Sequence, residues 1–248
     1  MHKLGLLGKN ISYSFSRNYF KTKFEKENIT DVSYQNFDIE DITTFPKIIR
    51  ETTNLKGLNV TIPYKEDVIP YLDKLNKKAE AIGAVNTIKL TKKGKLVGYN
   101  TDCYGFINSL KPLLTKRHKK ALILGTGGAS KAILYSLKEE NGIKCHYVSR
   151  TASKKVKYTY EDLTEAIISK YQIIINCTPL GTFPNIEECP KIPYNGISEN
   201  HILFDLVYNP EETLFLRLGK AQGAKTMNGL KMLKLQAEKA WSIWDIVR

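Results

Sequence analysis

The fold of this chain is decided by the stretch Ala121-Leu122-Ile123-Leu124-Gly125-Thr126-Gly127-Gly128-Ala129-Ser130. Its four apolar residues predict a buried strand, and residues 129–140 predict a helix that begins directly after the glycines. Glycines between a strand and a helix let the backbone approach a pyrophosphate at the positive helix N-terminus. The stretch therefore predicts a dinucleotide-binding turn, and a tight turn without a ligand is the alternative.

Outward from this turn, strands and helices alternate along the chain. Downstream, the pattern predicts a helix from about residue 160, a last helix at 230–247, and strands at 144–148, 156–159, 172–176, 201–206 and 225–227. Upstream, it predicts a hairpin of 85–90 with 95–99, a helix opened by Pro63, strands at 3–7, 32–37 and 55–60, and helices at 16–27, 44–50 and 102–114. Such alternation is typical of α/β proteins with parallel sheets.

Composition limits the classes of function. The 248 residues carry a formal charge of +13, which favours anionic ligands, but the basic residues are scattered and predict no nucleic-acid surface. No apolar run approaches a membrane span, and the apolar start is too short for a signal peptide. The four cysteines form no C-x-x-C pair and the four histidines are dispersed, so we expect no metal site and a reducing cytoplasm.

The segment after residue 148 indicates which dinucleotide is bound. An NAD site places an acidic residue about 20 residues beyond the glycines, where it holds the ribose hydroxyls. This chain has Ser149-Arg150-Thr151 there, followed by Lys154, and no Asp or Glu between residues 145 and 160. Cationic side chains attract the 2′-phosphate of NADP, so the segment favours NADP over NAD. The alternative is that Arg150 only caps a loop.

Three polar segments stand out in the first hundred residues. They are residues 8–16 (GKNISYSFS), residues 57–65 (GLNVTIPYK), and residues 84–87 (AVNT) with 100–102 (NTD). Each places hydroxyl, amide or charged groups at a strand end or a helix start. Open α/β sheets bind their ligands at that edge, so these segments predict a second binding region.

Taken together, these segments resemble the motifs of the shikimate dehydrogenase family over essentially the whole chain. The glycine turn is similar to the family's G-x-G-G-A-x loop, and Ser149-Arg150-Thr151 to its N-R-T motif. Three further matches are residues 175–181 (INCTPLG, for I-N-x-T-P-x-G), 205–210 (DLVYNP, for D-x-x-Y-x-P) and 229–236 (GLKMLKLQ, for G-x-x-M-L-x-x-Q).

The resemblance implies a role for each matching position. Lys65 and Asp102 would form the proton-transfer pair. The substrate-binding residues would be Ser14 and Ser16 for the carboxylate, Asn59, Thr61, Asn86 and Gln236 for the ring substituents, and Tyr208 near both ligands. The NADP-binding residues would be Gly125, Thr126, Gly127, Gly128, Ala129, Ser130, Ser149, Arg150, Thr151, Lys154, Thr178 and Gly229.

Taken singly, several of these residues have simpler explanations. Ser16 and Asp102 are good helix N-caps, and Lys65 suits a solvated first turn. Asn86 suits a turn before a strand, and Gln236 suits an exposed helix face. Their joint occurrence in the family's order favours the functional interpretation.

The chain also departs from the family's usual pattern. Seven positions differ in residue type: Tyr13, Arg17, the pair Tyr19-Phe20, Ser149, Lys154 and Thr182. The largest departure is a deletion, because residues 150–159 leave no room for a crossover helix. We therefore expect a loop to lead directly into a short strand at 156–159, which leaves one flank of the adenosine pocket more open.

The sequence thus predicts two domains of α/β class. Residues 1–100, completed by a returning C-terminal helix within 228–248, would form an open α/β substrate-binding catalytic domain, and residues 101–227 a Rossmann-like NADP-binding domain. The resemblance implies reversible NADPH-dependent reduction of 3-dehydroshikimate to shikimate, in aromatic amino acid (chorismate) biosynthesis, by a cytoplasmic monomer or homodimer. The alternatives are a broader quinate/shikimate dehydrogenase, with NAD as its possible cofactor, and a catalytically idle nucleotide-binding relative.

Overall fold

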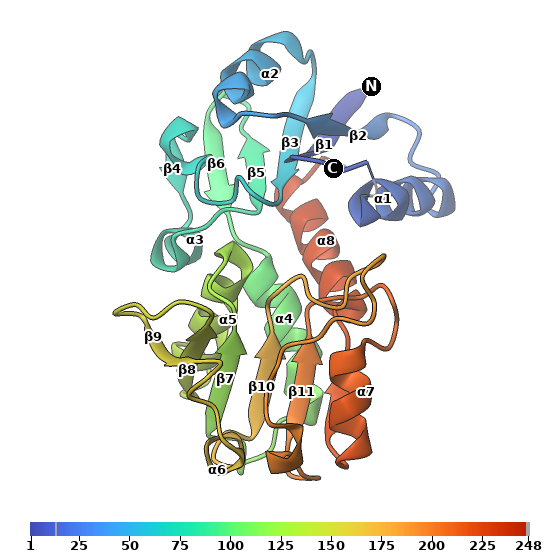
Figure 1. Cartoon of the computed structure of the whole chain (residues 1–248). Coiled ribbons are helices and arrows are strands. Elements are labelled where there is room, and N and C mark those ends of the chain that lie inside the picture. The colour runs from blue at the N-terminus through green and yellow to red at the C-terminus, as the bar shows by residue number, and fades with distance from the viewer. Residues whose placement is uncertain (13, 247–248) are drawn as a thin grey trace. The chain divides into compact units, whose positions relative to one another are not determined.

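A computed structural model describes residues 1–12 and 14–246 of the chain. The chain divides into two compact units, each with its own six-stranded sheet. The first unit comprises Met1–Thr101 and Gln236–Arg248, and the second comprises Asp102–Leu235. The last helix, α8 (Leu230–Trp244), therefore supplies residues to both units. Figure 1 shows the elements of each unit in the colours of their sequence order.

The first unit is built on a mixed sheet with strand order β2-β1-β3-β5-β6-β4. Its strands are β1 (His2–Gly8), β2 (Val32–Asp38), β3 (Leu55–Val60), β4 (Lys74–Leu75), β5 (Thr87–Leu90) and β6 (Leu96–Tyr99). Its other elements are α1 (Phe15–Lys26), α2 (Phe45–Glu51), α3 (Lys77–Ile82), and the 3₁₀ turns η1 (Ile42–Thr44) and η2 (Ile69–Tyr71). Strands β1, β2 and β3 are parallel, and β5 and β6 form the predicted antiparallel hairpin.

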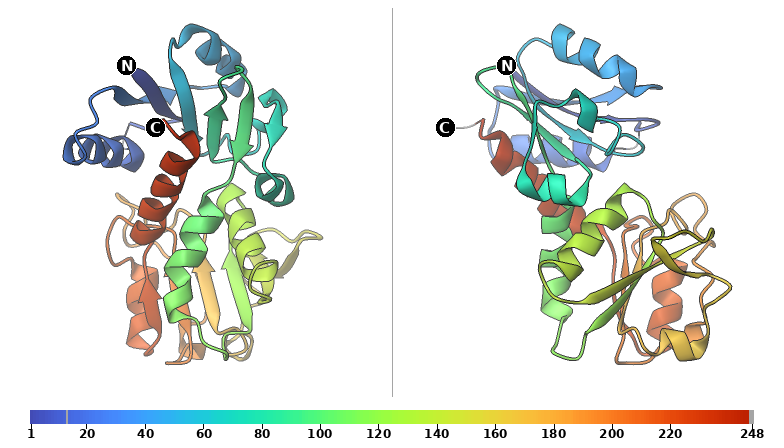
Figure 2. Two further views of the ribbon diagram at one scale, coloured as in Figure 1. Left: turned by 180° about the vertical axis from the view of Figure 1, so that it is seen from behind. Right: turned by 90° about the vertical axis from the view of Figure 1, so that its left-hand side faces the viewer.

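Alternation along β1 places apolar residues on both faces of this sheet. Leu4 packs with Phe20 of α1 and with Trp244 of α8 on one face. Leu7 packs with Phe45 of α2 on the other face. The helices that cover the two faces can be followed in Figure 2.

The second unit is a fully parallel sheet with strand order β12-β11-β10-β7-β8-β9. Its strands are β7 (Lys120–Leu124), β8 (Lys144–Ser149), β9 (Val156–Thr159), β10 (Ile173–Asn176), β11 (Ile202–Asp205) and β12 (Lys225–Met227). Its other elements are α4 (Asp102–Leu110), η3 (Lys111–Leu113), α5 (Gly128–Lys138), α6 (Glu165–Ile168), η4 (Tyr194–Gly196) and α7 (Leu214–Ala221). This strand order is that of the Rossmann fold, as the sequence predicted.

Helices cover both faces of the second sheet. Phe106 of α4 and Ile133 of α5 pack on one face, and Phe215 of α7 and Ile168 of α6 pack on the other. Because all six strands are parallel, their carboxyl ends meet at one edge, where an open α/β sheet binds its ligand. The strand order reverses between β7 and β10, and the glycine turn lies at this switch point.

The predicted strands are confirmed, and several other predictions need correction. No helix follows Pro63, where residues 62–68 form turns closed by hydrogen bonds from the Tyr64 N–H to Thr61 and from the Ile69 N–H to Glu66, and Pro70, which has no N–H, follows in η2. The helix expected from about residue 160 begins at Glu165, behind its N-cap Thr164. Helix α4 ends at Leu110, two residues before Pro112. Helix α8 ends at Trp244, and its predicted end at Val247 lies outside the described residues. Tyr13, where the chain differs from the family's usual pattern, also lies outside them.

The predicted deletion of a crossover helix is confirmed. Strand β9 spans the four predicted residues and pairs in parallel with β8, although only residues 150–155 connect the two strands. Parallel neighbours usually need a connection of a dozen or more residues. The strand β9 lies at the outer edge of its sheet, where Figure 1 shows it beside β8.

Trp244 offers a test of how α8 holds the first unit. Its indole is 3% exposed and donates a hydrogen bond to the carbonyl of Ile88 (2.9 Å), and a side chain at Gly57 would overlap it. We expect Trp244→Ala to lower the free energy of unfolding by about 3–5 kcal/mol, as for other large core residues. Trp241→Ala, at a half-buried position of the same helix, is the control and should cost clearly less in urea unfolding. Equal losses would contradict this account.

Candidate functional site

The glycine turn has the geometry that close approach of a ligand requires. Gly125 has φ +99°, a left-handed conformation that favours glycine, and its N–H donates to the carbonyl of Val148 (2.8 Å). Gly127 is the N-cap of α5, with no side-chain cap and no atom within 4 Å of the place where a Cβ would lie. Ser130 closes the turn by donating to the carbonyl of Gly127 (2.7 Å). The turn thus leaves open space before a helix N-terminus, which suits a pyrophosphate.

The predicted 2′-phosphate residues follow β8 at the same edge of the sheet. Ser149 ends the strand, and Arg150, Thr151 and Lys154 are exposed in the connection to β9. Within this connection, the Thr151 N–H donates a long hydrogen bond to the Ser149 hydroxyl (3.5 Å). An exposed guanidinium and ammonium at the carboxyl end of β8 fit a phosphate group better than a neutral ribose hydroxyl.

A buried hydrogen-bond network lies behind the loop that follows β10. Asn176 accepts from both the N–H (3.0 Å) and the hydroxyl (2.6 Å) of Thr178, and donates to the carboxyl of Asp205 (3.0 Å). Asp205 also accepts from the Val207 N–H (3.0 Å) and the Thr213 hydroxyl (2.6 Å). Thr178 lies against the glycine turn, since a Cβ on Gly125 would be 3.0 Å from its methyl group.

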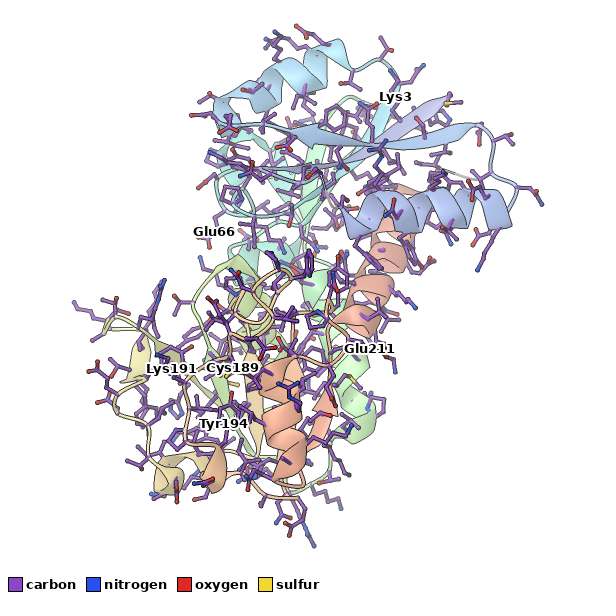
Figure 3. The ribbon with its side chains drawn as sticks, turned by 45° about the vertical axis from the view of Figure 1, so that its right-hand side comes forward. Lys3, Glu66, Cys189, Lys191, Tyr194 and Glu211 are labelled. Carbon is purple, nitrogen blue, oxygen red and sulfur yellow. The ribbon has the colours of Figure 1, made fainter. Side chains whose placement is uncertain are left out.

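The loop after β11 carries the remaining predicted residues of this unit. Tyr208 is half-buried, and burial raises the pKa of its phenol. Gly229 donates to the carbonyl of Val207 (3.0 Å), and a side chain there would overlap the Leu206 carbonyl, so the position needs glycine for packing. Asn228 donates to the carbonyl of Glu211 (2.8 Å), which Figure 3 labels in the connection before α7.

In the first unit, three of the predicted ring-binding residues lie in one buried polar network. Asn86 donates to Gln236 (3.3 Å) and to the Thr101 hydroxyl (3.0 Å), and it accepts from the Thr101 N–H (2.7 Å). Asn59 donates to the main-chain carbonyl of Asn86 and to the hydroxyl of Thr87, both at 3.3 Å. Asn59, Asn86 and Gln236 are buried, so the expectation of an exposed position for Gln236 is wrong. Asn86 does lie in a bend directly before β5, as expected, but its side chain is buried there.

Ser14 and Ser16 are both buried at the start of α1. Ser14, rather than Ser16, is the N-cap of the helix, because its hydroxyl oxygen accepts from the Arg17 N–H (3.1 Å). Ser16 lies beside the phenol of Tyr34, which donates to the side-chain carbonyl of Asn59 (2.8 Å). Ser16 is therefore a neighbour of the polar network around Asn86.

The predicted proton-transfer residues belong to different units. Lys65 is half-buried in the turns after β3, and its carbonyl accepts from the Val85 N–H (2.7 Å), which ties it to the segment before Asn86. Figure 3 labels its neighbour Glu66 in these turns. Thr61, also half-buried, begins the segment. Asp102 is buried as the first residue of α4 and follows Thr101 directly in the chain.

Sequence reasoning missed several members of these networks. Tyr34, Thr87 and Thr101 connect the ring-binding residues of the first unit, and Thr213 supports Asp205 in the second. Thr213 is the N-cap of α7 and Tyr34 lies in the half-buried β2, so neither carried a distinct signal. For Thr87 and Thr101 the available signal was a polar residue at the start of a strand or directly after one. Such residues are buried with the strand and must find hydrogen-bond partners there.

Neither a metal site nor a membrane helix emerges from the residues that the structure describes. Residues 1–12 and 14–246 contain no group of three or more His, Cys, Asp or Glu side chains arranged to hold a metal ion. No helix in that part of the chain is both long and apolar enough to cross a bilayer.

Asp205 predicts a specific dependence of stability on pH. Burial raises its pKa from 3.8 to about 6, against the hydrogen bonds from Thr213, Val207 and Asn176. Between these two values the folded protein holds a proton that the unfolded chain releases, so this group stabilises the fold as the pH falls. Relative to Asp205→Asn, we expect the protein to gain about 1.4 kcal/mol of unfolding free energy from pH 7.5 to pH 5. Urea unfolding of both proteins measures this difference, and a parallel pH dependence would contradict it.

Comparison with known proteins agrees with this geometry. The family model of the shikimate dehydrogenase substrate binding domain matches residues 6–88. A shikimate dehydrogenase (NADP(+)) from Clostridium botulinum is 39% identical, covering 98% of this chain and 96% of the relative. A solved shikimate dehydrogenase from Aquifex aeolicus is 34% identical, with a TM-score of 0.86 over 99% of this chain and 92% of the other. Shikimate 5-dehydrogenase from Thermus thermophilus, solved with NADP(H) and shikimate, is 30% identical, with a TM-score of 0.86 over 98% and 93%. This chain belongs to the shikimate dehydrogenase family.

Proposed function

We propose that this protein catalyses the reversible, NADPH-dependent reduction of 3-dehydroshikimate to shikimate. The observation that carries the proposal is that the residues matched to the family's motifs are joined by hydrogen bonds within each unit. In the first unit the amides of Asn59, Asn86 and Gln236 form one buried polar network. In the second, Asn176 and Thr178 stand beside the glycine turn.

The first unit supplies the groups for a polyhydroxylated ring acid. Asn59, Asn86 and Gln236 offer amide donors and acceptors for the ring hydroxyls, and Thr61 adds a hydroxyl. Ser14 and Ser16 would bind the carboxylate, because they lie at the positive N-terminus of α1. Each charge-assisted hydrogen bond of this kind contributes about 1.5–3 kcal/mol.

The second unit supplies the groups for NADP. Residues Gly125, Thr126, Gly127, Gly128, Ala129 and Ser130 would hold the pyrophosphate at the start of α5. Ser149, Arg150, Thr151 and Lys154 would hold the 2′-phosphate, while Thr178, Tyr208 and Gly229 would position the nicotinamide end. The bound cofactor supplies a hydride to the carbonyl carbon of the substrate.

The protein must also deliver one proton to the carbonyl oxygen as the alcohol forms. Lys65 is the proposed donor in reduction and the proposed acceptor in oxidation, because an ammonium group both stabilises the developing negative charge and transfers the proton. Asp102 is proposed to orient the Lys65 ammonium. Asp102 follows Thr101 directly in the chain. Because the Thr101 N–H donates to Asn86, the backbone of Asp102 is held next to the polar network.

The proposal assigns a separate ligand to each unit. The substrate belongs to residues 1–100 with the C-terminal helix, and the cofactor to residues 101–227. The two compact units differ from this division in that residues 228–235 belong to the second unit and Thr101 belongs to the first. Small molecules rather than nucleic acid are the proposed partners, and the cytoplasm, where NADPH is kept reduced, is the proposed compartment.

The direct test of the proposal is an absorbance assay for NADPH formation. Shikimate and quinate are each offered with NADP⁺ and with NAD⁺. We expect the highest kcat/KM for shikimate with NADP⁺. A preference for quinate would support the broader enzyme instead, and the absence of turnover with all four pairs would overturn the proposal.

Removal of Lys65 tests the proton-transfer role. We expect Lys65→Ala to lower kcat by about 10²- to 10⁴-fold, because general acid–base catalysis contributes on that order. The dissociation constant for NADPH, measured by fluorescence, should stay unchanged, since Lys65 lies outside the cofactor-binding set. Glu66→Ala, at the neighbouring exposed position, is the control and should keep normal turnover. Unchanged kcat in Lys65→Ala would exclude the role.

Reversal of charge at Arg150 tests the choice of cofactor. We expect Arg150→Glu to raise KM for NADP⁺ by roughly 10- to 100-fold, the equivalent of about 1.5–3 kcal/mol for a lost charge-assisted pair. The KM for NAD⁺, which lacks the 2′-phosphate, should change much less. Arg217→Glu, an exposed arginine on α7, is the control. Equal changes for both cofactors would show that Arg150 does not contact the 2′-phosphate.

A further inference from the structure

Asp205 is a buried carboxyl group that the proposed reaction does not use. It is the last residue of β11 and has no exposed surface. Asn176, Val207 and Thr213 all donate hydrogen bonds to it. A buried charge is costly unless such donors compensate it, so the presence of a carboxyl here needs a physical reason.

One branch of its contacts leads to the glycine turn. Asp205 Oδ1 accepts from Asn176 Nδ2 (3.0 Å), and Asn176 Oδ1 accepts from the hydroxyl (2.6 Å) and N–H (3.0 Å) of Thr178. The methyl group of Thr178 then packs against Gly125. The chain of contacts therefore runs from the carboxyl, through one amide, to the residue beside the predicted pyrophosphate site.

The direction of these hydrogen bonds is set by the oxygens around the Asn176 NH₂ group. An amide can present either its oxygen or its nitrogen to a neighbour, and the two orientations have similar shape. Asp205 Oδ1 accepts from Asn176 at 3.0 Å and the Leu180 carbonyl accepts at 3.3 Å, so Asn176 turns its NH₂ group toward these oxygens and its own oxygen toward Thr178. A flipped amide would place NH₂ against the Thr178 N–H and lose that hydrogen bond.

A second branch leads to the loop that carries Tyr208. Asp205 Oδ1 also accepts from the Val207 N–H (3.0 Å), which fixes the backbone next to Tyr208. The carbonyl of Val207 accepts from the Gly229 N–H (3.0 Å). One carboxyl oxygen thus holds both the loop after β10 and the loop after β11.

We infer that Asp205 is a positioning residue for the nucleotide cofactor, which it serves by orienting the Asn176 amide and the Val207 backbone. This inference rests on the proposed binding of NADP by the second unit. Asp205 acts through its neighbours rather than through the ligand. It sets the place of Thr178 and Tyr208, and cofactor affinity depends on those two residues being held before the cofactor arrives.

The geometry also says which substitution keeps the function. In Asp205→Asn, the remaining oxygen can still accept from Asn176 and Val207. The new NH₂ group then faces the Thr213 hydroxyl, which is able to accept. In Asp205→Ala, the nearer acceptor of the Asn176 NH₂ group is lost and only the Leu180 carbonyl (3.3 Å) remains.

The experiment measures the dissociation constant of NADPH by fluorescence for the full-length protein and its variants. We expect Asp205→Ala to weaken NADPH binding about tenfold or more, and Asp205→Asn to stay within about threefold of the unmodified protein. Asn176→Ala removes the next residue in the same chain of contacts. If Asp205→Ala does not fold, Asn176→Ala replaces it and should weaken NADPH binding to the same extent. Thr213→Val removes the Oδ2 contact and the N-cap hydrogen bond from the Leu216 N–H of α7, but leaves both Oδ1 contacts in place. It should lower the unfolding midpoint and leave NADPH binding unchanged.

A double-mutant cycle identifies the route of the effect. If Asp205 acts through Thr178, then Thr178→Val combined with Asp205→Ala should weaken binding far less than the product of the two separate effects. Normal NADPH affinity in folded Asp205→Ala or Asn176→Ala, or fully multiplicative effects in the cycle, would overturn the inference. Failure of the unmodified protein to bind NADPH would instead count against the proposed function.

Discussion

Both units depend on the same constraint, which is that a polar side chain buried at the end of a strand must have its hydrogen bonds satisfied by the protein. Asn86 meets this constraint through Thr101 and Gln236, and Asn176 meets it through Thr178 and Asp205. An unpaired buried amide would cost about 1–3 kcal/mol. The ligand-facing loops are therefore held by the same bonds that make burial of these amides tolerable.

This constraint explains why the family's motifs mix catalytic and structural residues. Gly229 fits the space beside the Leu206 carbonyl, Ser14 caps α1, and Asn176 orients Thr178. Each of them shapes a loop before any ligand is present. A matching motif therefore indicates a local geometry of the chain before it indicates any chemistry of the site.

Much of the fold could be predicted because its signals are local. The apolar runs at β7, β8 and β10 and the glycines after residue 124 predict strands and a turn without knowledge of the rest. The helix expected after Pro63 is absent and turns take its place, so a proline at a possible first helical position was not a sufficient signal. The short helix α3 and the two-residue strand β4 were not predicted, because elements of this length are too short to show a periodic pattern of apolar residues.

The candidate sites were predictable as residue types but not as networks. Ser16 and Ser14 are equally good caps by sequence, and only the backbone geometry shows that Ser14 accepts the Arg17 N–H. Tyr34 lies in a strand whose pattern is that of any half-buried strand, so its contact with Asn59 depends on pairing between distant segments. Asp205 looks like an ordinary strand-end acid until the fold surrounds it with donors.

The division of the first unit between the two ends of the chain has a consequence for biosynthesis. Leu4 and Phe20 emerge early from the ribosome, but their core also needs Ala237, Ala240 and Trp244 from α8. At about 5–20 residues per second, roughly 7–30 s pass between synthesis of residue 101 and of residue 244. The second unit is complete at Leu235 and can fold first. During that interval α1 alone covers this face of the N-terminal sheet, and the apolar surface that α8 will later cover stays exposed to a nascent-chain chaperone.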